Sequence, residues 1–197
     1  SIRRQRQMCI RDRKGTKNMK KIPAWLLLCI ISLVAGLALG FTNALTKDEI
    51  ARQDEASNEL ARKTVMSEAD EFVQLDVAAD SGVDYCYEAK KGGETIGYVA
   101  KATADGYGGK IEVTVGIDNN GMITGISCGG SGFSETPGLG AKVKEAKFSD
   151  QFAGMSAPVS LTKDGGQVDS VTAASRSSRA VCKAVNAACD YVAAMGS

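Results

Sequence analysis

The chain has 197 residues, 44% of them hydrophobic, and its 24 basic and 23 acidic side chains leave a formal net charge of +1. This length suits one domain with additional segments, and the balanced charge excludes the strongly basic surface that is typical of nucleic-acid-binding proteins. The sequence contains no histidine, so it lacks the commonest metal ligand and the usual general acid–base residue.

The first 21 residues are strongly basic and precede a long apolar stretch. Residues 1–18 show no apolar periodicity, and we expect them to be a non-native extension, with the native start at Met19. The alternative is a basic cytoplasmic tail that lies on anionic lipid.

Residues 22–45 carry no charged side chain, and a helix of this length spans the hydrocarbon core of about 30 Å. A signal peptide would have a shorter apolar core, of about 7–15 residues. Because Lys20 and Lys21 precede the apolar stretch, the positive-inside rule predicts a cytoplasmic N-terminus and an external domain.

Residues 46–67 alternate charged side chains with a thin apolar stripe, which predicts a helical connector. The sequence therefore divides into a basic segment (1–21), a transmembrane helix (22–45), this connector (46–67) and one domain (68–197).

Alternating apolar residues predict a meander of about four antiparallel strands, at 83–89, 95–102, 110–117 and 122–128. Glycines at Lys91–Gly93 and Asp118–Gly121 predict the turns between strands, and Gly121 is expected to have a positive φ. Residues 142–152 should form short helical pieces with Phe148 and Phe152 facing inward, and residues 158–162 another short strand. The predicted fold class is α+β: an N-terminal transmembrane helix followed by a single extracytoplasmic domain, with a mainly antiparallel sheet flanked by helices.

Six cysteines are present, but there is no Cys-x-x-Cys spacing, so we expect neither a zinc site nor an iron–sulfur cluster. Cys9 lies in the basic segment and Cys29 in the apolar stretch. We expect the other four to be buried free thiols, and the alternative is a bridge between Cys86 and Cys128.

Residues 169–181 read Asp-Ser-Val-Thr-Ala-Ala-Ser-Arg-Ser-Ser-Arg-Ala-Val. They predict a short strand, a turn of small residues and the start of a helix that continues to Val192. Because the first N–H groups of a helix lack partners and carry partial positive charge, this arrangement suits a phosphate. Hydroxyl and guanidinium groups gather there, at Thr172, Ser175, Ser177, Ser178, Arg176 and Arg179. The alternative is a Ser-capped surface helix without a ligand.

A second motif, Ser-Glu-Thr-Pro-Gly-Leu-Gly-Ala-Lys, covers residues 134–142, and Gly-Tyr-Gly-Gly covers residues 106–109. Together with the stretch at 169–181, they resemble the FMN-binding domain of the G subunit of Rnf electron-transport complexes and of the related Nqr C subunit. In that family a Ser/Thr-Gly-Ala-Thr motif holds FMN through a phosphoester on its last Thr.

Laid on this chain, that motif is Thr172, Ala173, Ala174 and Ser175, so the resemblance implies a phosphoester on Ser175. Ala173 replaces the usual glycine, which costs about 1 kcal/mol or more if the position needs a positive φ. Ser175 replaces the usual threonine but keeps an Oγ that can carry a phosphoester. The resemblance also implies that residues of the second motif border the flavin: Glu135, Thr136, Gly138, Leu139, Gly140 and Lys142. No catalytic residue is expected.

The function that the resemblance implies is electron relay through a covalently bound FMN, in an Rnf-type ferredoxin/NAD-linked ion-translocating complex, without independent catalysis. The implied location is the cytoplasmic (inner) membrane, crossed once. The implied partners are other membrane subunits, including a second flavin-bearing one, a flavin transferase and the lipid bilayer. The alternatives are an Nqr C-type or free-standing flavin carrier, and a scaffold protein without flavin.

Overall fold

The computed structural model describes residues 23–78, 81–130 and 132–195, and the chain divides into two compact units, Ser1–Glu49 and Ile50–Ser197. The expected extension at 1–18, the expected start at Met19 and the Lys20–Lys21 pair lie outside the described residues.

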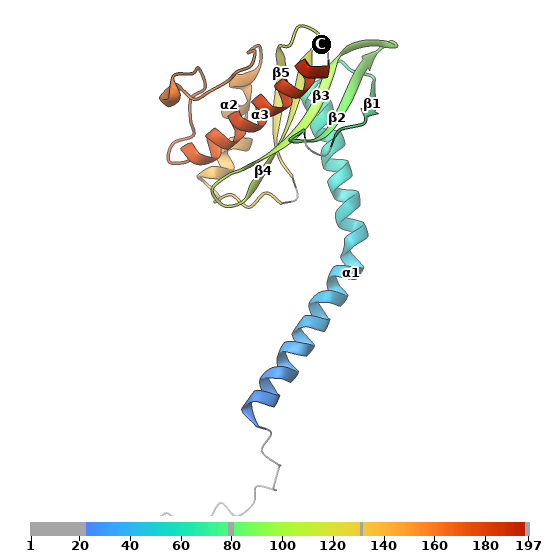
Figure 1. Cartoon of the computed structure of the whole chain (residues 1–197), viewed down its shortest axis with the longest axis vertical. Helices are drawn as coiled ribbons and strands as arrows, with labels where there is room; N and C mark the ends of the chain where they lie inside the picture. Colours follow the sequence, from blue (N-terminus) through green and yellow to red (C-terminus); the bar gives the residue numbers. More distant parts are fainter. Residues whose placement is uncertain (1–22, 79–80, 131, 196–197) are drawn as a thin grey trace, which may run out of the picture. The chain divides into compact units, whose positions relative to one another are not determined.

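A single helix, α1, runs from Ala24 to Val65 and joins the predicted membrane span and the predicted connector without a break (Figure 1). It contains no proline, and three hydroxyls in its part up to Thr46 donate to carbonyls one turn earlier, from Ser32, Thr42 and Thr46. Its apolar part is long enough and hydrophobic enough to cross a membrane, with a mean hydropathy of 2.5 over 18 residues. These internal bonds satisfy the hydroxyls where a bilayer offers no water.

The sheet of the second unit is a five-stranded antiparallel meander in the order β1-β2-β3-β4-β5. The four predicted strands are confirmed. The sheet also has a fifth strand, β1, which was not predicted because it is short and its buried residues do not alternate clearly. Gly121 has φ 77°, as predicted, and the turn before β3 has Gly92 at φ 60° and Gly93 at φ 90°. The strands are β1 Glu71–Leu75, β2 Val83–Lys91, β3 Glu94–Asp105, β4 Lys110–Asp118 and β5 Ile123–Gly129.

One face of the sheet is covered by the last helix, α3 (Ser175–Met195), which crosses β3 and β4 (Figure 1). Val181 and Val185 of α3 are fully buried in the same core as Val113 and Val115 of β4. The predicted inward-facing Phe148 and Phe152 are confirmed as buried and lie in short helical pieces. These pieces are η1 Gly140–Lys144, α2 Ala146–Ser149 and η2 Asp150–Phe152. The α+β class is therefore confirmed.

The opposite face of the sheet receives the end of α1. Val65 and Met66 form a second apolar cluster with Ala89 and Val99, and the Thr124 hydroxyl donates to the Val65 carbonyl oxygen at 2.6 Å. Two paired glycines, Gly116 of β4 and Gly125 of β5, lie under Val65. A side chain at Gly116 would meet the Val65 carbonyl oxygen at 2.7 Å, so the close approach requires glycine.

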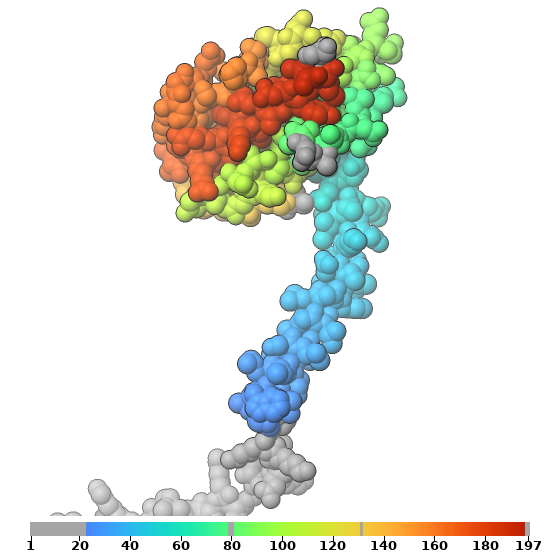
Figure 2. Space-filling view, viewed as in Figure 1, coloured from blue at the N-terminus to red at the C-terminus, as the bar shows by residue number. Residues whose placement is uncertain are grey.

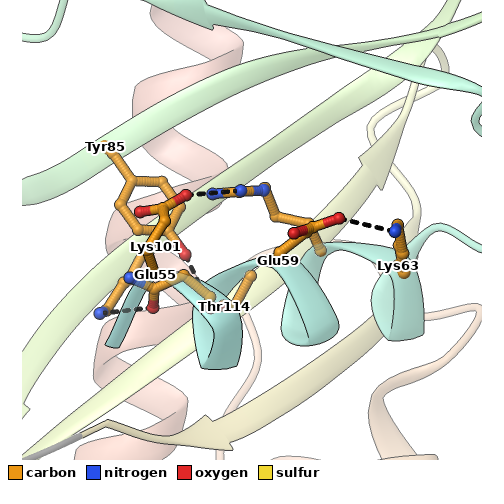
Figure 3. Close-up of polar contacts among 8 residues, drawn as sticks. Glu55, Glu59, Lys63, Tyr85, Lys101 and Thr114 are labelled. Atoms are coloured by element: carbon orange, nitrogen blue, oxygen red, sulfur yellow. Dashed lines mark hydrogen bonds and ion pairs between the residues drawn. The ribbon is translucent and has the colours of Figure 1, made fainter. Parts of the chain in front are cut away.

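Polar contacts surround this junction (Figure 3). Arg62 is buried, with its guanidinium 4.3 Å from the centre of the Tyr87 ring and one nitrogen 2.9 Å from a carboxylate oxygen of Glu55. Lys101 of β3 forms an ion pair with Glu112 and donates to the Asn58 side chain at 3.2 Å. The part of α1 from Asn58 to Val65 thus packs on the domain.

Two expected strands do not form. Residues 158–162 are not a strand, because the chain closes into a 3₁₀ turn, η3 (Thr162–Asp164), and only Leu161 forms a bridge, with Val168. Residues 169–171 have no strand partner either.

The alternative bridge between Cys86 and Cys128 does not form, and both are free thiols. Cys86 lies on β2 and Cys128 on β5, with two strands between them. At about 4.8 Å per strand, this separation exceeds the reach of a disulfide. The expectation of buried free thiols is confirmed for these two residues and for Cys182 and Cys189.

Candidate cofactor-binding site

The turn before α3 contains a residue in the left-handed conformation. Ala173 has φ 61° and is the one residue other than glycine with a positive φ among the described residues. The Ala174 N–H donates to the Val171 carbonyl oxygen at 3.0 Å, which closes the turn, and α3 begins at Ser175. The position of Ala173 therefore does need the left-handed conformation, which explains why a glycine suits this motif.

Ser175 lies at the first position of α3 with a partly exposed side chain. The Lys163 ammonium of η3 donates to the Ser175 hydroxyl oxygen at 3.3 Å. Sequence reasoning missed this lysine. Its only sequence signal is the Lys-Asp-Gly-Gly turn that directly precedes the motif.

The two arginines expected to add charge to the site have other partners. Arg179 forms two hydrogen bonds with the carboxylate of Asp164, at 2.6 and 2.7 Å. These hydrogen bonds lower the pKa of Asp164 and raise that of Arg179. Arg176 donates from Nε to the Gly106 carbonyl oxygen at 3.0 Å. Both arginines therefore fasten loops to the first turns of α3.

Of the four hydroxyls predicted near the phosphate, two are not accessible. Ser177 is 1% exposed and donates to Glu135, and Ser178 is fully buried. The Ser178 hydroxyl accepts from the Val171 N–H and donates to the Ala174 carbonyl oxygen. Thr172 and Ser175 are the hydroxyls of this turn that a ligand can reach.

Glu135 joins the three loops of the site. One carboxylate oxygen accepts the N–H groups of Tyr107 and Gly108 at 2.7 and 3.1 Å, and the other accepts the Ser177 hydroxyl at 2.9 Å. A side chain at Gly106 or at Gly140 would collide with this carboxylate. Glu135 is only 5% exposed. Its place in the structure is therefore that of a residue that positions the loops, and it does not present its carboxylate to a ligand.

The rest of the Pro-Gly loop lies on the surface beside this junction. The Thr136 carbonyl oxygen accepts the N–H groups of Leu139 and Ala141, both at 3.2 Å, and Gly138 has φ 78°. Leu139 is 44% exposed, although it is a large apolar residue. The loop thus presents an apolar side chain to the solvent from a hydrogen-bonded turn.

An open pocket of about 190 Å³ lies next to the turn. It brings the predicted Lys142 and Thr172 together, although 30 positions separate them in the chain. Figure 2 shows α3 on the surface of the domain, with residues of the 140–170 region (orange) gathered at its N-terminal end. The pocket is lined by Lys142, Glu145, Lys147, Phe148, Gln151, Asp169, Ser170, Val171 and Thr172.

These features suit a flavin phosphate. Ala173 and Ala174 have small side chains, the N–H groups of the first turn of α3 are free of helical partners, and the Ser175 hydroxyl is reachable. In the part of the chain that the structure describes, no cluster of acidic residues and cysteines could hold a metal ion.

Known proteins are similar to this chain over most of its length. Residues 106–190 match the model of the FMN-binding domain, and all three motifs lie within this range. The G subunit of the Na(+)-translocating ferredoxin:NAD(+) oxidoreductase complex of Acetobacterium woodii is 35% identical over an alignment of 181 residues, with 82% of this chain and 86% of that protein covered. The G subunit of an ion-translocating oxidoreductase complex of Methanosarcina acetivorans is 33% identical, with 85% and 92% covered.

Among solved structures, the C subunit of the Na(+)-translocating NADH-quinone reductase of Parabacteroides distasonis is similar, with a TM-score of 0.53. The likeness covers 72% of this chain and 92% of that one at 19% identity, so it shows a shared fold.

Proposed function

The chain belongs to the family of G subunits of ion-translocating oxidoreductase complexes, and we propose that it is the membrane-anchored subunit that relays electrons through FMN in an Rnf-type complex. FMN supplies the redox chemistry, and the protein supplies the binding site and its position among the other redox centres. The chain needs no catalytic residue of its own for this role.

The observation that carries the proposal is the reachable Ser175 hydroxyl at the start of α3, directly after the left-handed Ala173. A phosphate esterified to this oxygen would lie against the unpartnered N–H groups of the first turn of α3, which favour a negative charge. Thr172 is the other hydroxyl within reach. The burial of Ser177 against Glu135 argues against attachment at that residue.

The flavin ring would extend from this point over the pocket that Lys142 and Thr172 line, with the exposed Leu139 at its border. The pocket is smaller than the roughly 300–1,000 Å³ of most cofactor sites, so it would take part of the ring and leave an edge open for electron exchange. Glu135 would hold the loops in place from behind.

The location that best fits is the cytoplasmic (inner) membrane, crossed once by the apolar part of α1. Lys20 and Lys21, which precede the apolar stretch, support an N-terminus in the cytoplasm and a domain outside. Covalent attachment suits that side of the membrane, because FMN that dissociated there would be lost. A flavin transferase would make the bond, and the partners would be the other membrane subunits, including a second flavin-bearing one.

In-gel flavin fluorescence after denaturation tests the proposal. The chain would be produced in full length with a flavin transferase, as wild type, as Ser175→Ala and as Thr172→Ala. We expect fluorescence in wild type and in Thr172→Ala and none in Ser175→Ala.

The reverse result would move the bond to Thr172. A dark wild-type band, with no yellow colour in the native protein, would instead support a scaffold protein without flavin. Bound flavin in a purified complex with quinone-reductase subunits would support an Nqr C-type role.

A further inference from the structure

We propose that Lys163 is the counter-charge that holds the flavin phosphate on Ser175. The inference rests on the proposed function, because it assigns a partner to the phosphate of that same site. Lys163 lies outside the motifs that carry the resemblance, and it is identified by its contact with Ser175.

The contact places a positive charge at the atom that would carry the phosphoester. The Lys163 ammonium lies 3.3 Å from the Ser175 hydroxyl oxygen. A phosphorus bound to that oxygen brings its remaining oxygens to the same region, and one of them carries the negative charge of the diester. A charged hydrogen bond from an ammonium to such an oxygen is stronger than the neutral bond to a hydroxyl that it replaces.

The turn that carries Lys163 is fixed to α3, so the position of this lysine is built into the fold. The neighbouring Asp164 forms the two hydrogen bonds with Arg179, one turn after Ser175. The Asp164 N–H also donates to the Leu161 carbonyl oxygen at 2.8 Å, and Gly166 packs so closely on Ser160 that a side chain would collide.

The two arginines of the motif already have partners. Arg179 is bound to Asp164, and Arg176 donates to the Gly106 carbonyl oxygen. In the described part of the chain, Lys163 is the one basic side chain that is hydrogen-bonded to Ser175. It can therefore turn toward a phosphate without breaking another ion pair.

The first measurement is the rate of flavin attachment to the full-length chain in the presence of its transferase. We expect Lys163→Gln to slow the appearance of the adduct about threefold, in line with the modest strength of an exposed ion pair, and Lys163→Arg to restore it. Lys183→Gln is the matched control, because Lys183 is an exposed lysine on α3 outside the site, and it should behave as wild type.

The second measurement separates a phosphate contact from a structural role. The melting temperature of the flavin-bearing chain is measured with Lys163 intact and with Lys163→Gln. The same pair is then measured in the unmodified Ser175→Ala chain. We expect Lys163→Gln to lower the melting temperature by about 1–4 °C in the flavin-bearing chain only, and 0.5 M salt to remove the difference.

Equal melting shifts in both backgrounds, or attachment of flavin to Lys163→Gln at the wild-type rate, would overturn the assignment of Lys163 and leave the proposed function intact. Complete loss of the adduct in Lys163→Gln, with rescue by Lys163→Arg, would support the assignment. A wild-type chain that takes up no flavin would overturn the assignment together with covalent attachment on Ser175.

Discussion

At the scale of single residues, Ala173 has a backbone conformation that residues other than glycine rarely adopt. Its φ of 61° costs an L-residue about 1–2 kcal/mol. Replacing it with glycine removes that strain. Glycine also increases the conformational entropy of the unfolded chain, which costs about 0.4–1 kcal/mol of folding stability. We therefore expect Ala173→Gly to stabilise the domain by about 0.5–1 kcal/mol in urea unfolding.

The matched control is Ala187→Gly, the same substitution inside α3, which should lose about 1 kcal/mol. Destabilisation by Ala173→Gly as well would contradict the left-handed assignment of this position.

The four domain cysteines give a prediction for alkaline pH. Burial raises the pKa of Cys86, Cys182 and Cys189 to about 11 and that of Cys128 to about 12, from an ordinary value of 9.0. Because the folded state keeps these protons longer than the unfolded state, their contribution to stability is complete below pH 9 and is lost as the pH rises through 11.

At pH 8 the native domain should therefore resist iodoacetamide at all four thiols, and mass spectrometry should find them alkylated only after denaturation. A Cys128→Ala chain should also lose stability less steeply above pH 9 than wild type. Rapid alkylation of the folded domain would show that the thiols are not buried as described.

The site was only partly predictable at this scale. The small-residue turn, the helix start and the Pro-Gly loop are local patterns, so Ser175, Ala173 and Leu139 could be selected from the sequence. The contact between Lys163 and Ser175 depends on how a 3₁₀ turn packs against a helix twelve residues later. The pairing of Arg179 with Asp164 has the same origin, and it removed a charge that had been assigned to the phosphate.

At the scale of elements, the strands with regular alternation were predicted and the irregular ones were not. In β4, Ile111, Val113 and Val115 alternate with more polar residues and form the core under α3. Residues 158–162 have strand-like side chains, but the chain turns into η3 at Thr162 and does not join the sheet. Strand propensity therefore predicted a strand correctly where a neighbouring strand was available for pairing.

The junction between α1 and the sheet allows a matched pair of substitutions. An alanine at Gly116 would collide with the Thr124 hydroxyl and the Val65 carbonyl oxygen, whereas an alanine at Gly125 would have its nearest neighbour, the Val65 Cα, at 3.6 Å. We expect Gly116→Ala to cost about 1–3 kcal/mol of unfolding free energy, and Gly125→Ala to change it by less than about 0.5 kcal/mol.

Urea unfolding of the full chain in detergent measures both variants. Equal effects of the two alanines would show that the end of α1 does not lie against Gly116 as described.

At the scale of the whole molecule, the two faces of the sheet have separate tasks. One face carries α3, whose first turn forms the site, and the other receives the end of α1, from Asn58 to Val65. The apolar part of α1 belongs to the other unit and has the length and hydropathy of a membrane span. This division fits a protein that anchors a flavin site to a membrane complex.

The central claim is that this chain holds FMN by its phosphate on Ser175, and peptide mapping of the native protein tests it most directly. Trypsin cleaves after Lys163 and Arg176, so residues 164–176 form one peptide that contains Thr172 and Ser175. We predict that this peptide is about 440 Da heavier than its sequence, the mass of FMN less water, and that fragmentation places the addition on Ser175. An unmodified peptide, or an addition on Thr172, would contradict the claim.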